Sequence, residues 1–120
     1  MPTLRLTHEQ LMATPKYMLT WLRSMPPNVI ATSGLVSPSD CLGARFLRTF
    51  GYPDAHFGGF SYSEDLKWMD RKYPRWFFYT MTTISVDQRF RVPLSAKQCI
   101  DYIVETCRSN KLHLKHLDAK

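Results

Sequence analysis

Cys41 is the side chain of this sequence best placed to act as a nucleophile. In the expected helix that begins near residue 37, its thiol lies on the face away from the apolar stripe, and Arg45 and Arg48 follow within two turns. A helix N-terminus and nearby guanidinium groups both stabilise a thiolate, whereas the adjacent Asp40 opposes it. Cys41 is therefore the candidate reactive thiol, with an incidental exposed cysteine as the alternative interpretation.

Cysteine catalysis would also need an imidazole beside this thiol. Nothing in the spacing of the histidines brings one there; they are His8, His56, His113 and His116. No Cys-x-x-Cys pair occurs, and His113 and His116 fall in a segment expected to be extended, where they would lie on opposite faces. Gly58 and Gly59 lack the lysine and the following helix of a phosphate-binding loop. The sequence therefore predicts no catalytic residue, no metal site and no cofactor.

The remaining candidate site is a segment in which basic and aromatic side chains alternate, KWMDRKYPRWFFY, over residues 67–79. Its cations could neutralise phosphates while its rings stack on bases. Basic residues of two expected strands would extend the same surface. The predicted partner-binding residues are Lys67, Trp68, Arg71, Lys72, Tyr73, Arg75, Trp76, Arg89, Arg91, Lys111 and Lys115. In the competing interpretation, some of these rings belong to the core and the charges only solvate the end of a helix.

The net charge of the chain favours a polyanionic partner. Lysine and arginine number 16 against 10 aspartates and glutamates, which gives a formal charge of +6. Up to residue 60 there are five basic and three acidic residues, and beyond it eleven and seven. Such a charge attracts nucleic acid, although it also serves solubility alone. No zinc-finger, KH or RNP motif accompanies it.

Length and cysteine content predict a single compact domain over residues 1–120 in the cytoplasm. A chain of 120 residues is long enough for one hydrophobic core without cross-links. Cys41, Cys99 and Cys107 make an odd set of thiols, which is typical of a reducing compartment. The first ten residues lack the apolar stretch of a signal peptide, and no apolar run approaches the roughly 20 residues that span a bilayer. We therefore expect no membrane partner.

Capping residues mark the expected helices. Side-chain oxygens that can accept from the first free backbone amides stand at Thr7, Thr14, Ser37, Ser63 and Ser95. Gln10 and Gln98 complete reciprocal capping boxes three residues after their caps. Gly51 is suited to the left-handed residue that ends the third helix. The helix that starts at Ser63 is expected to end with Arg71 and Lys72.

The strands are less sharply defined than the helices. Residues 29–31 predict a short strand, and residues 54–63 predict a strand with a glycine bulge or a hairpin. The β-branched and aromatic segment 76–86 predicts a buried strand, with a buried helix as the alternative. Residues 89–92 and 111–117 alternate basic and apolar residues, which predicts half-buried strands, the second of them at an edge or as a frayed tail. The fold class is α+β, with three or four helices on a small, mainly antiparallel sheet.

These observations predict a non-enzymatic binding module that docks nucleic acid or a ribonucleoprotein through a basic and aromatic surface. Arginine, tryptophan and tyrosine also dominate protein interfaces. The alternative is therefore a small inhibitor or adaptor that acts by protein–protein interaction, alone or as a homodimer. A thiol-dependent enzyme that uses Cys41 is the third and weakest interpretation.

Overall fold

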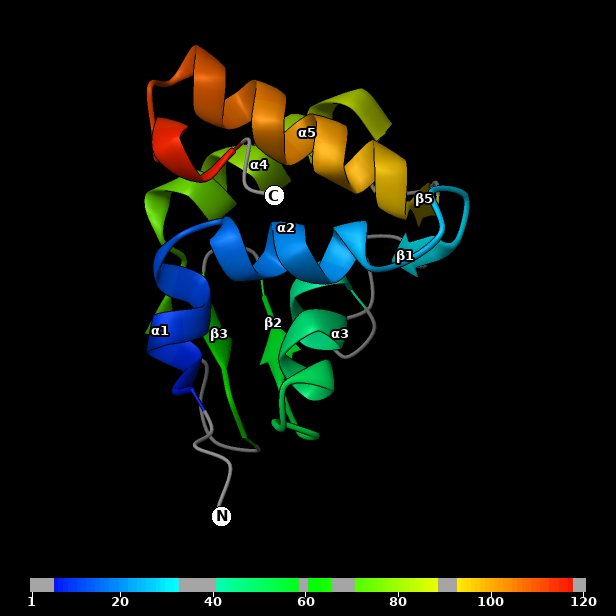
Figure 1. Ribbon diagram of the computed structural model, residues 1–120. Helices are drawn as coiled ribbons and strands as arrows, with labels where there is room; N and C mark the ends of the chain where they lie inside the picture. The colour runs from blue at the N-terminus through cyan, green and yellow to red at the C-terminus, as the bar shows by residue number, and fades with distance from the viewer. Residues whose placement is uncertain (1–5, 33–40, 59–60, 66–70, 89–92, 118–120) are drawn as a thin grey trace.

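The computed structural model is an α+β fold, as the sequence predicts, and describes residues 6–32, 41–58, 61–65, 71–88 and 93–117 (Figure 1). Its helices are α1 (His8–Ala13), α2 (Lys16–Arg23), α3 (Leu42–Thr49), α4 (Arg75–Gln88), α5 (Ala96–Ser109) and the short 3-10 helix η1 (Leu114–His116). Its strands are β1 (Ile30–Thr32), β2 (His56–Phe57), β3 (Ser61–Ser63), β4 (Arg71–Lys72) and β5 (Leu94–Ser95).

The strands form two small antiparallel sheets. β1 pairs with β5, and β2, β3 and β4 form a meander in that order. Of the two alternatives for residues 54–63, the hairpin is therefore the one present, with Phe57 opposite Tyr62. Tyr62 in turn lies opposite Arg71, so both side chains leave the same face of the sheet. That pairing positions the polar cluster described below.

Helix α2 lies between the two halves of the molecule. In Figure 1 it crosses the middle of the view, with α4 and α5 on one side and α3 and the β2–β3 hairpin on the other. Its buried side chains Met18, Leu19 and Leu22 join one continuous core whose largest members include Trp76 and Phe46. In the part of the chain that the structure describes, no helix is long and apolar enough to cross a membrane.

The predicted capping boxes at Thr7 and Ser95 are confirmed. The amide of Gln10 donates to the Thr7 hydroxyl at 3.0 Å, and the Gln10 side chain accepts from the Thr7 amide at 2.9 Å. Ser95 and Gln98 make the same two bonds at the start of α5, at 3.2 and 2.9 Å. These bonds satisfy amides that have no partner within the helix. The N-termini of α1 and α5 are consequently determined by pairs of residues that are three apart in the sequence.

The predicted strand over residues 76–86 is wrong, because this segment lies within helix α4. Trp76, Phe77, Thr80 and Ile84 are fully buried at helical spacing, and α4 packs beside α5. The threonine hydroxyls support the helix, since that of Thr80 donates to the Trp76 carbonyl one turn earlier at 2.7 Å. Burial of one helical face in the core therefore overrides the β propensity of the segment.

Two further segments differ from the predictions. Arg71 and Lys72 form β4 instead of ending a helix, and the Ser63 hydroxyl accepts from the Asp65 amide at 3.2 Å in a local turn. Residues 111–117 form a turn and η1 instead of an edge strand. The helix α3 begins at Leu42, while the predicted cap at Ser37 and the predicted strand at 89–92 lie outside the described residues.

Candidate functional site

The described cations of the predicted basic and aromatic surface are exposed, whereas its described rings are buried or half-buried. Arg71, Lys72 and Arg75 are exposed on β4 and at the start of α4. Lys111 and Lys115 are also exposed, after α5 and within η1. The other predicted residues Lys67, Trp68, Arg89 and Arg91 lie outside the described part of the chain.

Trp76 is not a surface residue, which corrects the expectation that its ring could bind a partner. Its side chain is fully buried, and its indole nitrogen donates to the Met12 carbonyl at 2.7 Å. The ring packs against Phe77. A tryptophan on the inward face of α4 removes a large apolar area from water, so Trp76 holds α4 to the end of α1 and is unavailable for stacking.

Tyr73 is half-buried and is likewise occupied within the fold. Its ring packs edge-on against Phe77, with the ring centres 4.8 Å apart, and its hydroxyl donates to the Gly58 carbonyl. Burial raises the pKa of this phenol well above its usual range. Tyr73 therefore ties the start of α4 to the β2–β3 hairpin, and its ring does not face a partner.

Four exposed cations remain, and we call them the basic edge: Lys72, Arg75, Lys111 and Lys115. None of the four forms an ion pair with another residue that the structure describes. Figure 1 shows the start of α4 and η1 at the same edge of the view, coloured green and red. Arg71 differs from them, because its guanidinium lies 3.3 Å from the Glu64 carboxylate.

Lys111 occupies a backbone position that usually needs glycine. The Leu112 amide donates to the Cys107 carbonyl at 2.8 Å and the Lys111 amide to the Arg108 carbonyl at 3.2 Å, which is the Schellman ending of α5. This ending places Lys111 in the left-handed region, with φ of 55°. A side chain there costs about 1–2 kcal/mol. The lysine is thus present at a cost in stability.

Arg75 occupies a second unfavourable position. It is the first residue of α4, and no acidic residue accompanies it in the first turn. The unpaired amides of a helix N-terminus carry partial positive charge, which repels a cation. Two of the four cations in the basic edge therefore stand where another residue would stabilise the fold better.

A second polar cluster surrounds His8, which the sequence did not indicate as a site. Its Nδ1 lies 3.0 Å from the Tyr62 hydroxyl, and its Nε2 lies 3.1 Å from the Glu64 carboxylate. His8 is only 5% exposed and also packs edge-on against Tyr52 and Tyr62. Because His8 and Tyr62 are 54 residues apart, no local spacing in the sequence could have revealed this cluster.

Electrostatics around His8 favour a structural role. Partial burial acts to raise the pKa of Glu64, but its own backbone amide, Arg71 and His8 outweigh this and hold that pKa below its usual range. Burial, together with the negative Glu64, raises the pKa of Tyr62 to about 12. Both imidazole nitrogens of His8 are engaged, so neither is free to take a proton from a substrate. The cluster joins α1 to the β3–β4 pair.

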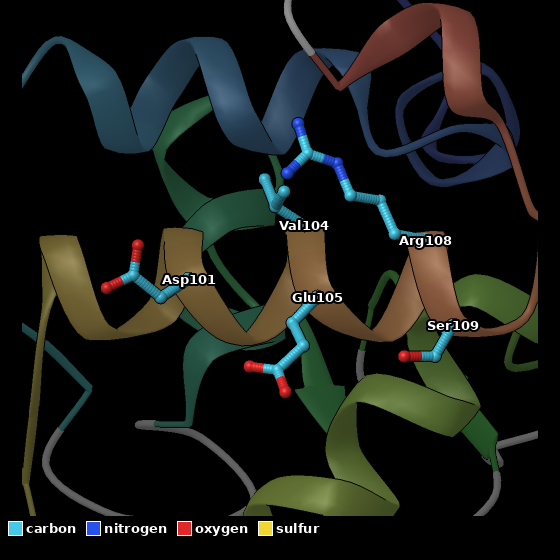
Figure 2. Close-up of a pocket in the computed structure, with 5 residues that line it drawn as sticks. All are labelled: Asp101, Val104, Glu105, Arg108 and Ser109. Atoms are coloured by element: carbon cyan, nitrogen blue, oxygen red, sulfur yellow. The ribbon is translucent and has the colours of Figure 1, made fainter.

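The surface next to His8 forms an open depression of about 510 Å³, lined by Glu9, Tyr52, Asp54, Glu64 and Arg71 among others. A second depression, of about 480 Å³, follows one side of α5 (Figure 2). Figure 2 shows Glu105 and Ser109 pointing to one side of the helix while Arg108 reaches toward Val104 on the other. The described residues contain no group of three side chains that could hold a metal ion.

The expected position of Cys41 on an exposed helix face is wrong. Cys41 is the N-cap of α3 and is 4% exposed. Burial raises the pKa of its thiol, and this outweighs the backbone amides of Ala44 and Gly43 and the charge of Arg48, which lower it. Burial also raises the pKa of Cys99 to about 12. The structure therefore gives Cys41 no activated thiolate.

Comparison with known proteins adds no assignment. No protein-family model, no curated protein and no solved structure matches this chain.

Proposed function

We propose that this protein is a non-enzymatic binding module that docks nucleic acid, free or within a ribonucleoprotein, through the basic edge. The observation that carries the proposal is the placement of Lys111 and Arg75. Each stands where the local backbone disfavours it, at a left-handed residue and at a helix N-terminus. Local rules are broken most often at functional positions, where stability is traded for binding.

Phosphates, and not bases, are the chemical groups that this surface fits. The rings of Trp76 and Tyr73 are occupied within the core, and the large apolar side chains exposed in the described residues include no aromatic one. Cations without exposed rings contact the backbone of a nucleic acid, which is independent of sequence. We therefore expect little preference among sequences and a strong dependence on salt.

A protein partner is the second candidate, and it has weaker support. The exposed large apolar residues Val29, Ile30, Val86 and Leu114 are aliphatic. Protein interfaces are centred mainly on tryptophan, tyrosine and arginine, and the rings of Trp76 and Tyr73 are occupied within the fold. An inhibitor or adaptor would therefore have to bind through charge, and a homodimer would have to bring positive surfaces together.

We further infer that the protein works in the cytoplasm. Cys41, Cys99 and Cys107 are all free and buried in the core. Free thiols persist in a reducing compartment, which supports this location.

The test is a fluorescence anisotropy titration of the full chain with a labelled 20-base-pair duplex and a single strand at several salt concentrations. The variant Lys72→Gln/Arg75→Gln/Lys111→Asn/Lys115→Gln removes the basic edge, and asparagine tolerates the left-handed backbone at residue 111. We expect about 100-fold weaker binding and a salt slope reduced by about 3 to 4.

Lys97→Gln is the matched control, since Lys97 is an exposed cation paired with Asp101 on α5 at 2.8 Å. It should change the affinity less than twofold, about the effect of a remote single charge. Absence of binding at low salt, or equal binding by the quadruple variant, would overturn the proposal. Capture of a protein that survives nuclease treatment, with no nucleic-acid binding, would favour the adaptor.

A further inference from the structure

Two histidines lie beside Lys111 and Lys115, the C-terminal lysines of the basic edge. His113 and His116 lie with their ring centres 6.1 Å apart, and both are half-buried. Lys111 and Lys115 are exposed in the same six residues. Four basic side chains are thus gathered in one short turn, and two of them are imidazoles, the side-chain type whose charge most often responds to physiological changes in pH.

The turn is held in place by the surrounding fold. The His116 amide donates to the His113 carbonyl at 2.9 Å, and Leu117 is buried in the core. The Arg23 guanidinium of α2 donates to the Leu117 carbonyl at 2.6 Å. His113, like Lys111, has a left-handed backbone, with φ of 49°. The imidazoles therefore keep their positions beside the lysines, which lowers the entropic cost of presenting them to a partner.

The charged groups that act on the His113 imidazole are His116 and Lys115, and both are basic. Lys115 and Lys111 lie on their own segment, Arg108 lies at the end of α5, and Arg23 reaches the segment from α2. Within the described residues, no carboxylate forms an ion pair with either imidazole. Protonation therefore adds positive charge that no described acidic group cancels.

We propose that His113 and His116 make docking to the basic edge dependent on pH, so that protonation of the two imidazoles tightens the grip on nucleic-acid phosphates. This inference rests on the proposed function and specifies how it is regulated. Two imidazolium groups would raise the formal charge of Lys111, His113, Lys115 and His116 from +2 to +4. By linkage, a bound polyanion must in turn favour proton uptake.

The local electrostatics set the direction of the effect. Partial burial, followed by the charges of His116 and Lys115, lowers the pKa of His113 below its usual range. His113 is therefore protonated at a lower pH than an unperturbed histidine. Nearby phosphates act in the opposite direction, because an anion stabilises the imidazolium.

The experiment measures duplex affinity at pH 7.5 and pH 5.5 at constant ionic strength, with the full chain. We expect binding about tenfold tighter at pH 5.5 and a salt slope steeper by about 1 to 2. The variant His113→Asn/His116→Gln should lose this dependence and keep the affinity of pH 7.5. Asparagine is chosen because it tolerates the left-handed backbone at residue 113.

His56→Gln is the matched control, because His56 lies on β2, outside the turn. It should leave the pH dependence unchanged. NMR titration of the imidazole protons in the free protein gives a readout without a partner, and His113 should titrate below the usual range for histidine. Circular dichroism confirms that each variant is folded before binding is compared.

The two proposals fail in different ways. Absence of duplex binding at both pH values would overturn the proposed function. Equal affinity at both pH values, or a pH dependence that survives in His113→Asn/His116→Gln, would overturn the regulation by these histidines while the docking itself stands.

Discussion

The His8 cluster and the basic edge both contain charged side chains, but in the described part of the chain these are paired within the fold in the first and unpaired in the second. Around His8, each polar group has a partner: the Tyr62 hydroxyl, the imidazole and the Glu64 carboxylate follow one another at 3.0 and 3.1 Å. On the basic edge, Lys72, Arg75, Lys111 and Lys115 have no ion-pair partner among the described residues. Charges that are buried must be paired to be tolerated, whereas unpaired exposed charges remain available for another molecule.

The comparison separates stability from binding. The His8 cluster connects α1 with β3 and β4, so its loss should weaken the fold. The basic edge includes two cations at unfavourable backbone positions, so its loss should spare the fold or stabilise it. Four substitution experiments test this contrast, from the largest expected effect on stability to the smallest.

Replacement of the buried imidazole should have the largest effect. His8→Ala leaves the Tyr62 hydroxyl without its partner and removes one of the two described partners of the Glu64 carboxylate, and an unsatisfied buried polar group costs about 2 kcal/mol. Urea denaturation followed by circular dichroism should show that loss. His56→Ala is the control, since the His56 ring forms one hydrogen bond in the described residues, to the nearby Asp54 carbonyl at 3.2 Å. Equal losses in both variants would contradict the role of the cluster.

The second-largest effect on stability should appear in acid, where the interactions of the Glu64 carboxylate are lost. Because the folded pKa of Glu64 is held below its usual range, its contribution to stability is complete above the unfolded pKa and is lost as the pH falls through the folded value. The free energy of unfolding of the wild type should therefore decrease between roughly pH 5 and pH 3.

Glu64→Gln should flatten that decrease, because glutamine does not titrate. Asp101→Asn is the matched control, since Asp101 pairs with Lys97 on the exposed surface of α5. Surface pairs of this kind contribute little to stability, so Asp101→Asn should keep the slope of the wild type. A Glu64→Gln protein with an unchanged slope would show that another group causes the acid sensitivity.

The third-largest effect on stability is expected when the two left-handed residues Gly51 and Lys111 are exchanged. The change in the free energy of unfolding should have opposite signs at the two positions. Gly51 ends α3 with the same pair of bonds that Lys111 makes at the end of α5, from Gly51 to Arg48 at 3.2 Å and from Tyr52 to Leu47 at 3.0 Å. Lys111→Gly should stabilise the protein by about 0.5–1 kcal/mol, and Gly51→Lys should destabilise it by about 1 kcal/mol. Thermal denaturation measures both.

Binding measurements make this exchange more informative. Lys111→Gly should weaken duplex binding while it stabilises the fold, whereas Gly51→Lys should leave the basic edge intact. If the wild type is more stable than Lys111→Gly, there is no evidence that stability is traded for charge at residue 111.

The smallest effect on stability is expected for the remaining cations. Lys72→Gln and Lys115→Gln should change the free energy of unfolding by less than about 0.5 kcal/mol, as is usual for exposed side chains. Arg75→Gln should stabilise α4 by about 0.3 kcal/mol, because it removes a cation from a helix N-terminus. A destabilisation above about 1 kcal/mol in any of the three would mean that the basic edge supports the fold.

The sequence predicted correctly those features that neighbouring residues decide. The capping boxes of Thr7 with Gln10 and of Ser95 with Gln98 are present as expected, since each needs only a side chain and an amide three residues away. The Schellman ending at Gly51 is local for the same reason. The α+β class follows from such local signals taken together, and so does the hairpin within residues 54–63.

Tertiary structure decided what depends on distant partners. Residues 75–88 have β propensity yet form α4, because the packed core buries one helical face of the segment. Trp76 belongs to the core because the Met12 carbonyl, 64 residues away, accepts from its indole. Tyr62 reaches His8 only through the register of β3 and the position of α1. Burial and long-range hydrogen bonds arise only when the whole chain is packed, so the sequence predicted the basic charges while the fold decided which of them stay exposed.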